Sequence, residues 1–392
     1  MRVLLVHNRY QQSGGEDVVF AAEAELLRRR GHEVVSYTDD NDRIDGMNRL
    51  RLAGQTIWSV TSARALRELI RSTHPAVVHV HNTFPLISPA VYHAARLEAV
   101  PVVQTLHNYR LICPGSVLHR DSQPCVDCVG HLPLAGIRHA CYRGSRAQTA
   151  VVAAMLAVHR ARRTWSREVD CFIALSDFAR RQFVRGGVSA AKLVVKPNFV
   201  EPDPGGRLAD GGYYLYAGRL DPTKGLPTLL AAWERGGIAA PLHIAGDGPA
   251  AEDVRAAAAR LPQVRLLGRL DRDQLLNQMR SARALVFPSL LYENFPVSIV
   301  EAFACGVPVI ASRLGAAAEI VEDRRTGLLF EPGDAGDLAE TVLRAEAEPE
   351  LVCRLGDAAR SVYLARYTGD RNYQQLLDIY ARVMGMAHTE IG

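Results

Sequence analysis

The sequence of 392 residues lacks any apolar stretch near the roughly 20 residues that a membrane-spanning helix needs. It has no low-complexity tract, and the N-terminal run Met1–Asn8 is too short to be a signal peptide. These absences lead us to expect a cytoplasmic protein in a reducing compartment, whose seven cysteines form no structural disulfides. A large excess of one charge is also absent. The net charge of +4 favours neither anionic ligands nor an acidic membrane surface strongly.

Short apolar runs alternate with helical patterns along most of the chain. In the first half, strand-like runs lie at residues 3–6, 33–37, 76–80, 100–106, 171–175 and 192–196, and helical patterns lie at 16–30, 62–72, 89–98 and 147–165 and begin again at 176. In the second half, strand-like runs lie at 213–216, 242–245, 264–267, 284–288 and 307–311. Continuous buried strands that alternate with helices predict parallel, doubly wound sheets.

Two breaks in this alternation suggest the domain organisation. Residues 108–146 form an insertion rich in Pro, Gly and Cys, and residues 197–212 are poor in apolar side chains and read as a linker. We therefore expect an N-terminal domain over 1–197 and a C-terminal domain over 212–366. An amphipathic helix within 367–392 is expected to cross back to the first domain.

Four of the seven cysteines lie in the insertion. They form the pattern C-x11-C-x2-C-x12-C, which comprises Cys113, Cys125, Cys128 and Cys141. Four thiolates in one short reduced segment suit a tetrahedral zinc site, which would order a segment that has little core. Three histidines are possible substitutes for one cysteine: His119, His131 and His139. Free thiols, a redox disulfide and an iron–sulfur cluster are the alternatives.

Two segments after predicted strands could seat an anion. In the first, Gly218 gives the backbone conformational freedom. Arg219 and Lys224 bring two positive charges that could clamp a diphosphate. The alternative is a solvated turn with two surface cations. The second segment, residues 293–301 (ENFPVSIVE), predicts a loop and then a helix that begins near Pro296. The N–H groups and dipole at such a helix start attract anions.

Taken together, these motifs resemble the family-4 retaining glycosyltransferases of the GT-B fold over essentially the whole chain. The matching pieces are Gly14-Gly15, TLHN at 105–108, GRLDPTKG at 218–225, AGDGP at 245–249, Pro288-Ser289, and ENFPVSIVEA at 293–302 followed by ACGVPVIAS at 304–312. The resemblance implies an α/β fold with two Rossmann-like domains that face each other across a cleft. It implies a nucleotide-diphosphate sugar as donor and a glycan, lipid-linked or small-molecule acceptor.

The resemblance also implies roles for particular residues. The donor's diphosphate would lie on Arg219, Lys224 and the backbone of the segment Asn294, Phe295, Pro296 and Val297. Glu301 would accept hydrogen bonds from the ribose hydroxyls, and Glu293 would face the transferred sugar. Gly14 and Gly15 would let the first domain close on the diphosphate, and His107 would position the sugar without acting as a strong base.

The implied chemistry is a same-face transfer in which the departing phosphate oxygen takes the acceptor's proton. Asp271-Arg272-Asp273 has the form of a metal-binding Asp-x-Asp string, but it precedes a helical pattern, so we interpret Asp271 as a helix N-cap and expect no catalytic metal. Where the family commonly has His-Asp, this chain has His107-Asn108. A carboxylate role at position 108 is therefore in doubt.

Two rival functions are compatible with parts of the sequence. A GT-B-like sugar-nucleotide epimerase would grip the same diphosphate but need no acceptor. A zinc-containing nucleic-acid-binding protein would use the Arg-rich segments 28–30 and 160–163, but these lack an accompanying aromatic platform, so we expect no nucleic-acid partner. The Arg28–Arg30 segment could instead rest on an anionic membrane where a lipid-linked acceptor resides.

Overall fold

The computed structural model describes residues 1–11, 14–208 and 211–389. The chain divides into two compact units, which we describe separately. The first contains Met1–Leu118, Cys125–Pro197 and the residues from Asn372 on, and the second contains His119–Pro124 and Asn198–Arg371. Within the described residues, none of the helices combines the length and the apolar character needed to cross a bilayer.

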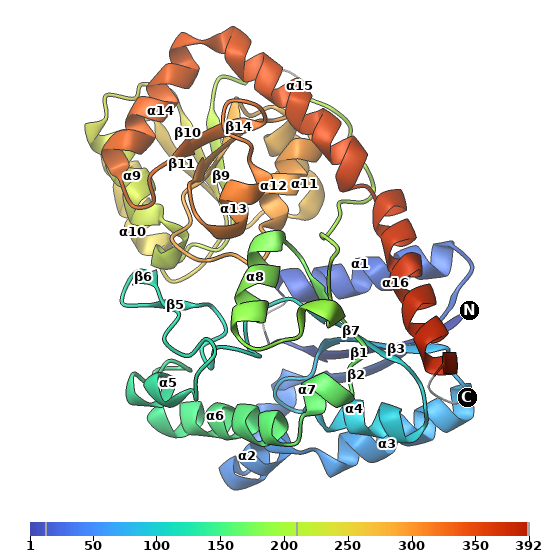
Figure 1. Ribbon diagram of the computed structural model, residues 1–392. Coiled ribbons are helices and arrows are strands. Elements are labelled where there is room, and N and C mark those ends of the chain that lie inside the picture. Colours follow the sequence, from blue (N-terminus) through green and yellow to red (C-terminus); the bar gives the residue numbers. More distant parts are fainter. Residues whose placement is uncertain (12–13, 209–210, 390–392) are drawn as a thin grey trace. The chain divides into compact units, whose positions relative to one another are not determined.

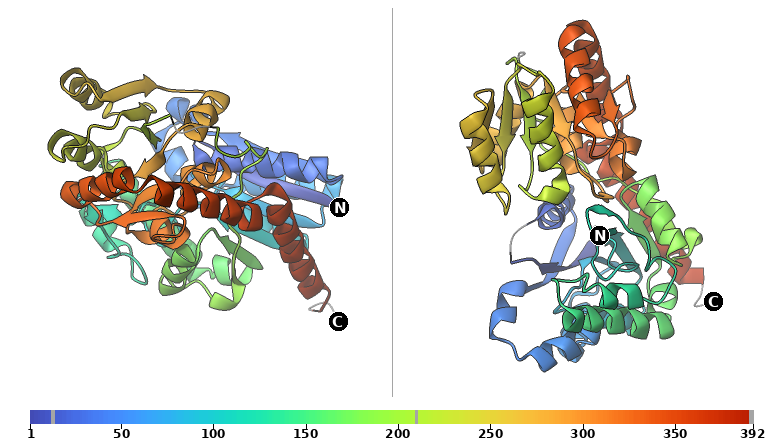
Figure 2. Two further views of the ribbon diagram at one scale, coloured as in Figure 1. Left: turned by 90° about the horizontal axis from the view of Figure 1, so that it is seen from above. Right: turned by 90° about the vertical axis from the view of Figure 1, so that its left-hand side faces the viewer.

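The first unit is built on a six-stranded parallel sheet in the order β2-β1-β3-β4-β7-β8, with helices on both faces (Figures 1 and 2). Its strands are β1 (Arg2–Arg9), β2 (Glu33–Asp40), β3 (Val77–Asn82), β4 (Val102–Leu106), β7 (Cys171–Ala174) and β8 (Leu193–Val195). The side chains of Val3 to Val6 are fully buried, as expected of a strand that is covered on both faces.

Helices of several lengths connect these strands. They are α1 (Gly15–Arg29), α2 (Arg49–Ile57), α3 (Val60–Thr73), α4 (Ala90–Leu97), α5 (Leu134–Arg138), α6 (Arg146–Ala161), α7 (Thr164–Arg167) and α8 (Asp177–Arg185), with the short 3-10 helices η1 (Asn41–Gly46) and η2 (Ala190–Lys192). Within the insertion lie the short helix α5 and a small hairpin of β5 (His119–Arg120) and β6 (Gln123–Pro124), and the hairpin groups with the second unit.

One predicted helix is interrupted. The pattern over 147–165 suggests a single helix, but the chain breaks between α6 and α7, where Arg163 adopts a left-handed conformation with φ of 57°. The break lets the imidazole of His159 bond both the Thr164 hydroxyl, at 3.0 Å, and the carbonyl oxygen of Ile57, at 2.8 Å. The two hydrogen bonds of the buried His159 imidazole therefore form where the helix ends.

The C-terminal helix α16 (Gly369–Thr389) joins the first unit from Asn372 on. The Asn372 amide oxygen accepts from Lys196 at 3.2 Å, and its amide nitrogen donates to the carbonyl oxygen of Pro197 at 2.8 Å. Further along, the Tyr380 hydroxyl lies 2.7 Å from Nδ1 of His79 on β3. The helix thus completes the core of the first unit with residues from the far end of the sequence (Figure 1).

The second unit repeats the architecture, with a parallel sheet in the order β11-β10-β9-β12-β13-β14. The strands are β9 (Tyr214–Ala217), β10 (Leu242–Ala245), β11 (Val264–Gly268), β12 (Ala284–Phe287), β13 (Val309–Ser312) and β14 (Gly327–Phe330). The helices are η3 (Pro222–Lys224), α9 (Leu226–Arg235), α10 (Ala251–Arg260), α11 (Arg272–Arg280), α12 (Val297–Ala304), α13 (Gly315–Ile320), α14 (Ala335–Ala347) and α15 (Pro349–Arg366). Strand β14 had not been predicted.

The start of the predicted linker is tied to the second unit. Val200 forms a bridge with Thr368, and the Asp203 carboxylate pairs with the Arg360 guanidinium at 2.7 Å. These contacts could not be predicted from the sequence, because Thr368 and Arg360 lie more than 150 residues from their partners. The predicted fold class, α/β with two Rossmann-like domains, is confirmed.

Candidate functional site

In each sheet the strand order reverses once, between β1 and β3 in the first unit and between β9 and β12 in the second. Ligands of open α/β sheets bind beyond the carboxyl ends of the strands that flank such a reversal. The predicted site residues follow β1 and β4 in the first unit and β9 and β12 in the second. The topology therefore gathers them into two groups, one in each unit.

Close backbone approach shapes the group in the second unit. Gly225 has φ of 78°, and a methyl group added there would lie 1.8 Å from the carbonyl oxygen of Pro288. Gly246 has φ of 145°, and its methyl group would lie 1.9 Å from the carbonyl oxygen of Gly218. Only glycine fits both positions, and the loops after β9, β10 and β12 are thereby held against one another.

Lys224 and Glu293 form the centre of this group. The Lys224 ammonium lies 2.6 Å from Oε1 of Glu293, and the Ser289 hydroxyl donates to the same oxygen at 2.8 Å. The side chains are 29% and 17% exposed, so both remain within reach of a ligand. Sequence reasoning gave these two residues separate partners, whereas the structure without a ligand pairs them with each other.

A second cation lies in the same loop. Arg219 follows Gly218 directly after β9, and its side chain is exposed without a hydrogen bond or ion pair to a described residue. Its backbone carbonyl accepts from the Tyr216 hydroxyl at 2.8 Å, which fixes the loop while the guanidinium stays available. Arginine can then meet an oxyanion with two parallel N–H donors.

The start of α12 offers backbone donors. Pro296 is the N-cap, the helix begins at Val297, and among the described residues no side chain caps its first N–H groups. The flanking residues are fixed, because Asn294 is buried and the Phe295 ring packs edge-on against Tyr367 at 6.1 Å between ring centroids. Uncapped donors at the positive end of a helix dipole suit an anion.

Glu301 lies on the second turn of α12. It is half-buried, and its carboxylate makes no hydrogen bond or ion pair with a described residue. Burial raises the pKa of this carboxyl group, and Arg272 opposes that shift. A desolvated carboxylate without a protein donor gains from ligand hydroxyl groups that supply the missing hydrogen bonds.

The group in the first unit begins with the Gly14-Gly15 pair at the start of α1. Gly14 donates its backbone N–H to Oδ2 of Asp17 at 2.8 Å, and the other carboxylate oxygen lies 2.8 Å from Nε2 of His7 on β1. Neither glycine has a positive φ, and a methyl group on either would meet no atom closer than 4.0 Å. The packing of the unit therefore does not itself require glycine at these positions.

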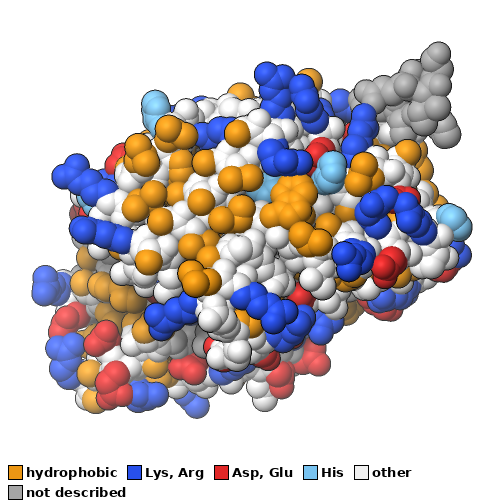
Figure 3. Space-filling model, turned by 90° about the horizontal axis from the view of Figure 1, so that it is seen from below, with side chains coloured by type: hydrophobic (Ala, Val, Ile, Leu, Met, Phe, Trp, Pro, Cys, Tyr) orange, Lys and Arg blue, Asp and Glu red, His pale blue; other side chains and the backbone are white. Residues whose placement is uncertain are grey.

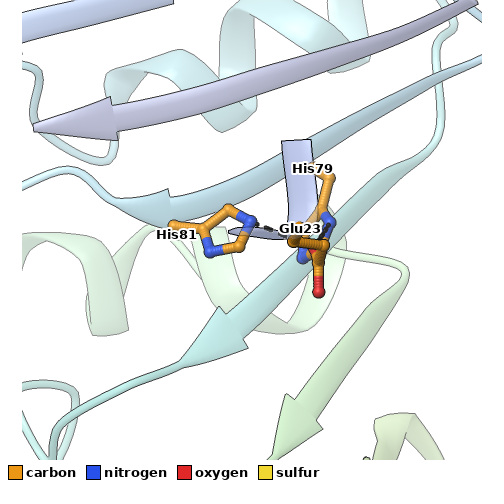
Figure 4. Close-up of side chains that lie close together, drawn as sticks. All are labelled: Glu23, His79 and His81. Carbon is orange, nitrogen blue, oxygen red and sulfur yellow. Dashed lines mark ion pairs between the residues drawn. The ribbon is translucent and has the colours of Figure 1, made fainter. Parts of the chain in front are cut away.

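His107 follows β4 and stacks on His81 of β3, with ring centroids 5.2 Å apart. Its Nε2 lies 2.9 Å from Nδ1 of His81, and Nε2 of His81 lies 3.2 Å from the Glu23 carboxylate. Figure 4 shows Glu23 between His81 and His79. Burial lowers the pKa of His107 well below its ordinary value, and that of His81 to about 4, so both imidazoles are neutral near pH 7.

Asn108 has no carboxyl group of its own but donates a hydrogen bond to that of Glu16. Its side-chain amide donates to Oε2 of Glu16 at 3.1 Å, and Tyr10 also bonds this carboxyl group. Burial raises the pKa of Glu16 to about 7. A buried carboxyl group from the start of α1 therefore lies beside Asn108.

A pocket next to His107 lies entirely within the first unit. It has an empty volume of about 510 Å³, which includes open solvent, and Gln104 and Trp165 line it with polar atoms that have no hydrogen-bond partner. Arg110 lies at its edge, with its guanidinium 4.1 Å from the centre of the Phe84 ring. Polar and aromatic groups therefore meet in one concave surface.

The four cysteines of the insertion come close together. Burial raises the pKa of the Cys128 thiol to about 11, and the three other thiols add to this shift. None of the four is joined to another in a disulfide in this structure. Within the described residues, however, only Glu23, His79 and His81 bring three ligand atoms within 4.8 Å of one another. The thiols are thus gathered but not arranged around a metal.

Asp271 caps α11, and its carboxylate accepts from the backbone N–H of Gln274 at 2.8 Å. Our interpretation of this residue as an N-cap is confirmed. Sequence reasoning missed Glu16, Glu23 and His81. The available signals were a glutamate on the apolar face of a predicted helix and the alternation His79-Val80-His81, which points two imidazoles to one face of a strand.

Comparisons with known proteins agree with this architecture. Residues 13–204 match the family described as Glycosyltransferase Family 4, and residues 202–362 match that described as Glycosyl transferases group 1. A phosphatidyl-myo-inositol mannosyltransferase of Mycobacterium leprae is 31% identical over 56% of this chain and 61% of its own length. The match spans about half the length of the first curated relatives, with shares of 42%, 50% and 41%.

Two solved structures cover nearly the whole chain. Sucrose-phosphate synthase from Thermosynechococcus elongatus superposes with a TM-score of 0.72 at 20% identity, covering 98% of this chain and 99% of that one. Anabaena HepE in complex with UDP gives 0.67 at 18% identity, with coverage of 97% and 100%. The family matches over residues 13–362 and the two Rossmann-like sheets show that this chain belongs to the GT-B glycosyltransferases, with a family 4 N-terminal half and a group 1 C-terminal half.

Proposed function

We propose that the protein transfers a sugar from a nucleotide-diphosphate donor to an acceptor hydroxyl group, with retention and without a catalytic metal. The observation that carries the proposal is the arrangement beyond β9 and β12. Two cations, an uncapped helix start and two carboxylates converge there on one unit. The acceptor is a glycan, a lipid-linked sugar or a small molecule. HepE, a structural neighbour, was solved with UDP, which supports a diphosphate donor.

In this proposal the second unit stabilises the leaving group. Cleavage of the sugar–phosphate bond leaves negative charge on the diphosphate, and Arg219, Lys224 and the N–H groups at Val297 would stabilise that charge as it develops. Glu301 would bind the ribose hydroxyls, and Glu293 those of the sugar. In the proposed complex the donor phosphate takes the place of Glu293 beside the Lys224 ammonium, and Glu293 accepts a hydrogen bond from a sugar hydroxyl.

Retention would follow from attack on the face that the diphosphate leaves, with a phosphate oxygen taking the acceptor's proton. His107 then acts as a hydrogen-bonding group, in keeping with its lowered pKa. The absence of packing demands on Gly14 and Gly15 supports their assignment as backbone that approaches the diphosphate.

The test measures product formation with the matching donor, found by thermal-shift screening of nucleoside diphosphates and their sugars. Lys224→Ala and Glu293→Ala should each lower kcat/KM at least about 1,000-fold while leaving the melting temperature nearly unchanged. Arg235→Ala and Glu340→Ala, at exposed positions in the same unit, serve as charge-matched controls. Near-normal turnover in either site variant would refute the assignment. Sugar release or isomerisation without acceptor would favour an epimerase instead.

We further propose that the cysteine quartet binds zinc. The gathering of four cysteines without a disulfide, in a segment with little regular structure, supports this. Purified protein should contain about one zinc per chain, and Cys125→Ser should lose it, whereas Cys353→Ser, at an exposed position outside the quartet, should not. Less than ~0.2 zinc per chain in the wild-type protein would contradict the proposal.

Peripheral contact with an anionic membrane is a separate proposal. On the face in Figure 3, Lys and Arg side chains lie among exposed hydrophobic ones. On α2, Leu50 is 84% exposed and is flanked by Arg49 and Arg51, and the Arg28–Arg30 segment adds basic side chains at the end of α1. Flotation with vesicles rich in phosphatidylserine tests it. Absence of binding at low salt would remove the proposal.

A further inference from the structure

A chain of side chains links a buried carboxylate to His107 inside the first unit. Oε1 of Glu23 lies 3.2 Å from Nε2 of His81, and Nδ1 of His81 lies 2.9 Å from Nε2 of His107. Glu23 and His81 are 1% and 3% exposed, whereas His107 is half-buried and lines the pocket described above. The Nδ1 atom of His107 has no hydrogen-bond partner among the described residues. The chain therefore begins in the core and ends at an accessible ring nitrogen.

The charge at the buried end is fixed by its surroundings. Lys196 donates to Oε2 of Glu23 at 3.0 Å and is itself held by Asn372 at 3.2 Å. Burial opposes ionisation of Glu23, but Lys196 and the neighbouring imidazoles outweigh it and hold the pKa of Glu23 well below its ordinary value. Glu23 is therefore a carboxylate, which can accept hydrogen bonds but cannot donate them.

The proton positions along the chain follow from this. A neutral imidazole carries one N–H, and for His81 the nitrogen that faces the carboxylate is the favourable place for it, because a lone pair there would face negative charge. Nε2 of His81 has no well-aligned hydrogen bond to any described residue, so the carboxylate at 3.2 Å is its electrostatic partner. Nδ1 of His81 then carries the lone pair, and His107 must donate to it from Nε2.

We propose that Glu23 and His81 are positioning residues that hold His107 as the Nε2–H tautomer, so that its Nδ1 accepts a hydrogen bond from a hydroxyl group of the bound sugar. The last clause rests on the proposed function, whereas the tautomer does not. The opposite tautomer would present an N–H at the same place, which could only donate. The pair Glu23–His81, which we call the relay, therefore determines whether Nδ1 of His107 accepts or donates a hydrogen bond.

A metal ion is the competing interpretation of the same cluster. The ligand atoms of Glu23, His79 and His81 lie within 4.8 Å of one another, which a cation could exploit. However, the Lys196 ammonium already neutralises Glu23, and His79 is occupied by Tyr380 at 2.7 Å and Thr105 at 2.8 Å. A dication would have to displace these partners, so the geometry favours the relay.

The test reads the tautomers directly by long-range ¹H–¹⁵N NMR of histidine-labelled protein without ligand, with His107 assigned from the spectrum of His107→Asn. The wild-type spectrum should show a proton on Nε2 and none on Nδ1 of His107. In Glu23→Gln the amide can donate to His81, and both imidazoles should switch to Nδ1–H. Tyr380→Phe, which removes a bond to His79 only, is the matched control and should leave His107 unchanged.

Activity supplies the second readout. Glu23→Gln should lower kcat/KM for transfer roughly 10- to 100-fold, the range seen when a group that orients a functional imidazole is lost. An Nδ1–H tautomer of His107 in the wild-type protein would overturn the proposal, and this outcome does not depend on any variant folding. So would stoichiometric metal bound at Glu23 and His81. The expected tautomers without any transferase activity would leave the relay in place and refute only the proposed function.

Discussion

At the scale of single residues, Glu16 is the side chain whose ionisation should affect stability most visibly. Burial raises the pKa of its carboxyl group from 4.5 to about 7, so the folded state retains a proton that the unfolded chain loses near pH 4.5. Between these two values the folded state binds more protons, and stability therefore falls as the pH rises. The loss is complete above about pH 7.

Glu16→Gln removes this titration. We expect the free energy of unfolding of the variant, relative to wild type, to rise by roughly 1–3 kcal/mol between pH 4.5 and pH 8. Urea unfolding at several pH values measures it. Glu25→Gln, at an exposed position of the same helix, is the matched control for the replacement of a glutamate there. A flat difference for Glu16→Gln would mean that the carboxyl group is hydrated.

Sequence reasoning found the site residues that stand in motifs and missed those that act through packing. Lys224 and Glu293 follow strands in recognisable segments, so their location could be predicted, but not their mutual ion pair, because 69 residues separate them. The position of Glu23 on the apolar face of a predicted helix was a signal, but it did not identify the partners of this residue. The role of Glu23, on α1, depends on His81 of β3 and on Lys196, which follows β8, and only the fold brings the three together.

At the scale of elements, the turns beyond β9 and β10 interlock through Gly246. An added methyl group there would meet the backbone of Gly218, which has no flexible side chain that could move aside. We expect Gly246→Ala to lower the free energy of unfolding by about 3 kcal/mol or more, from steric overlap added to an unfavourable φ.

Gly237→Ala is the control for backbone conformation alone. Gly237 also has a positive φ, of 68°, but a methyl group there meets nothing within 4 Å. Its loss should be limited to about 1–2 kcal/mol. Denaturant titration of the two variants measures the difference. Equal losses would show that the turns can separate without cost.

The elements that the sequence predicted are those with continuous apolar runs. Strand β14 was missed because it is only four residues long, begins with Gly327 and follows a polar segment, and α2 was missed because arginines and polar residues break its apolar pattern. The sequence also suggested one helix where α6 and α7 are separate. The reason is tertiary, since His159 bonds Ile57 from a distant helix.

At the scale of the whole molecule, α16 is part of the first unit's core. Leu376 and Tyr380 are fully buried, and Ile379 is 7% exposed. Leu376→Ala should lower the free energy of unfolding by about 2–5 kcal/mol, the range for a large buried side chain. Leu364→Ala, at a position on α15 that is 50% exposed, should change it by no more than about 0.5 kcal/mol. Thermal or urea unfolding distinguishes the two. Similar small effects would mean that α16 is only loosely attached.

The return of the chain to the first unit also orders events during synthesis. Residues 198–371 are contiguous apart from the small hairpin at 119–124, so the second unit can fold as soon as they leave the ribosome. The first unit is begun earlier but lacks two of its buried hydrogen bonds until α16 is made, because Lys196 bonds Asn372 and His79 bonds Tyr380. The half of the protein that is translated first is therefore the half that is completed last, and until α16 is made its six-stranded sheet lacks the helix that carries Leu376 and Tyr380 into the core.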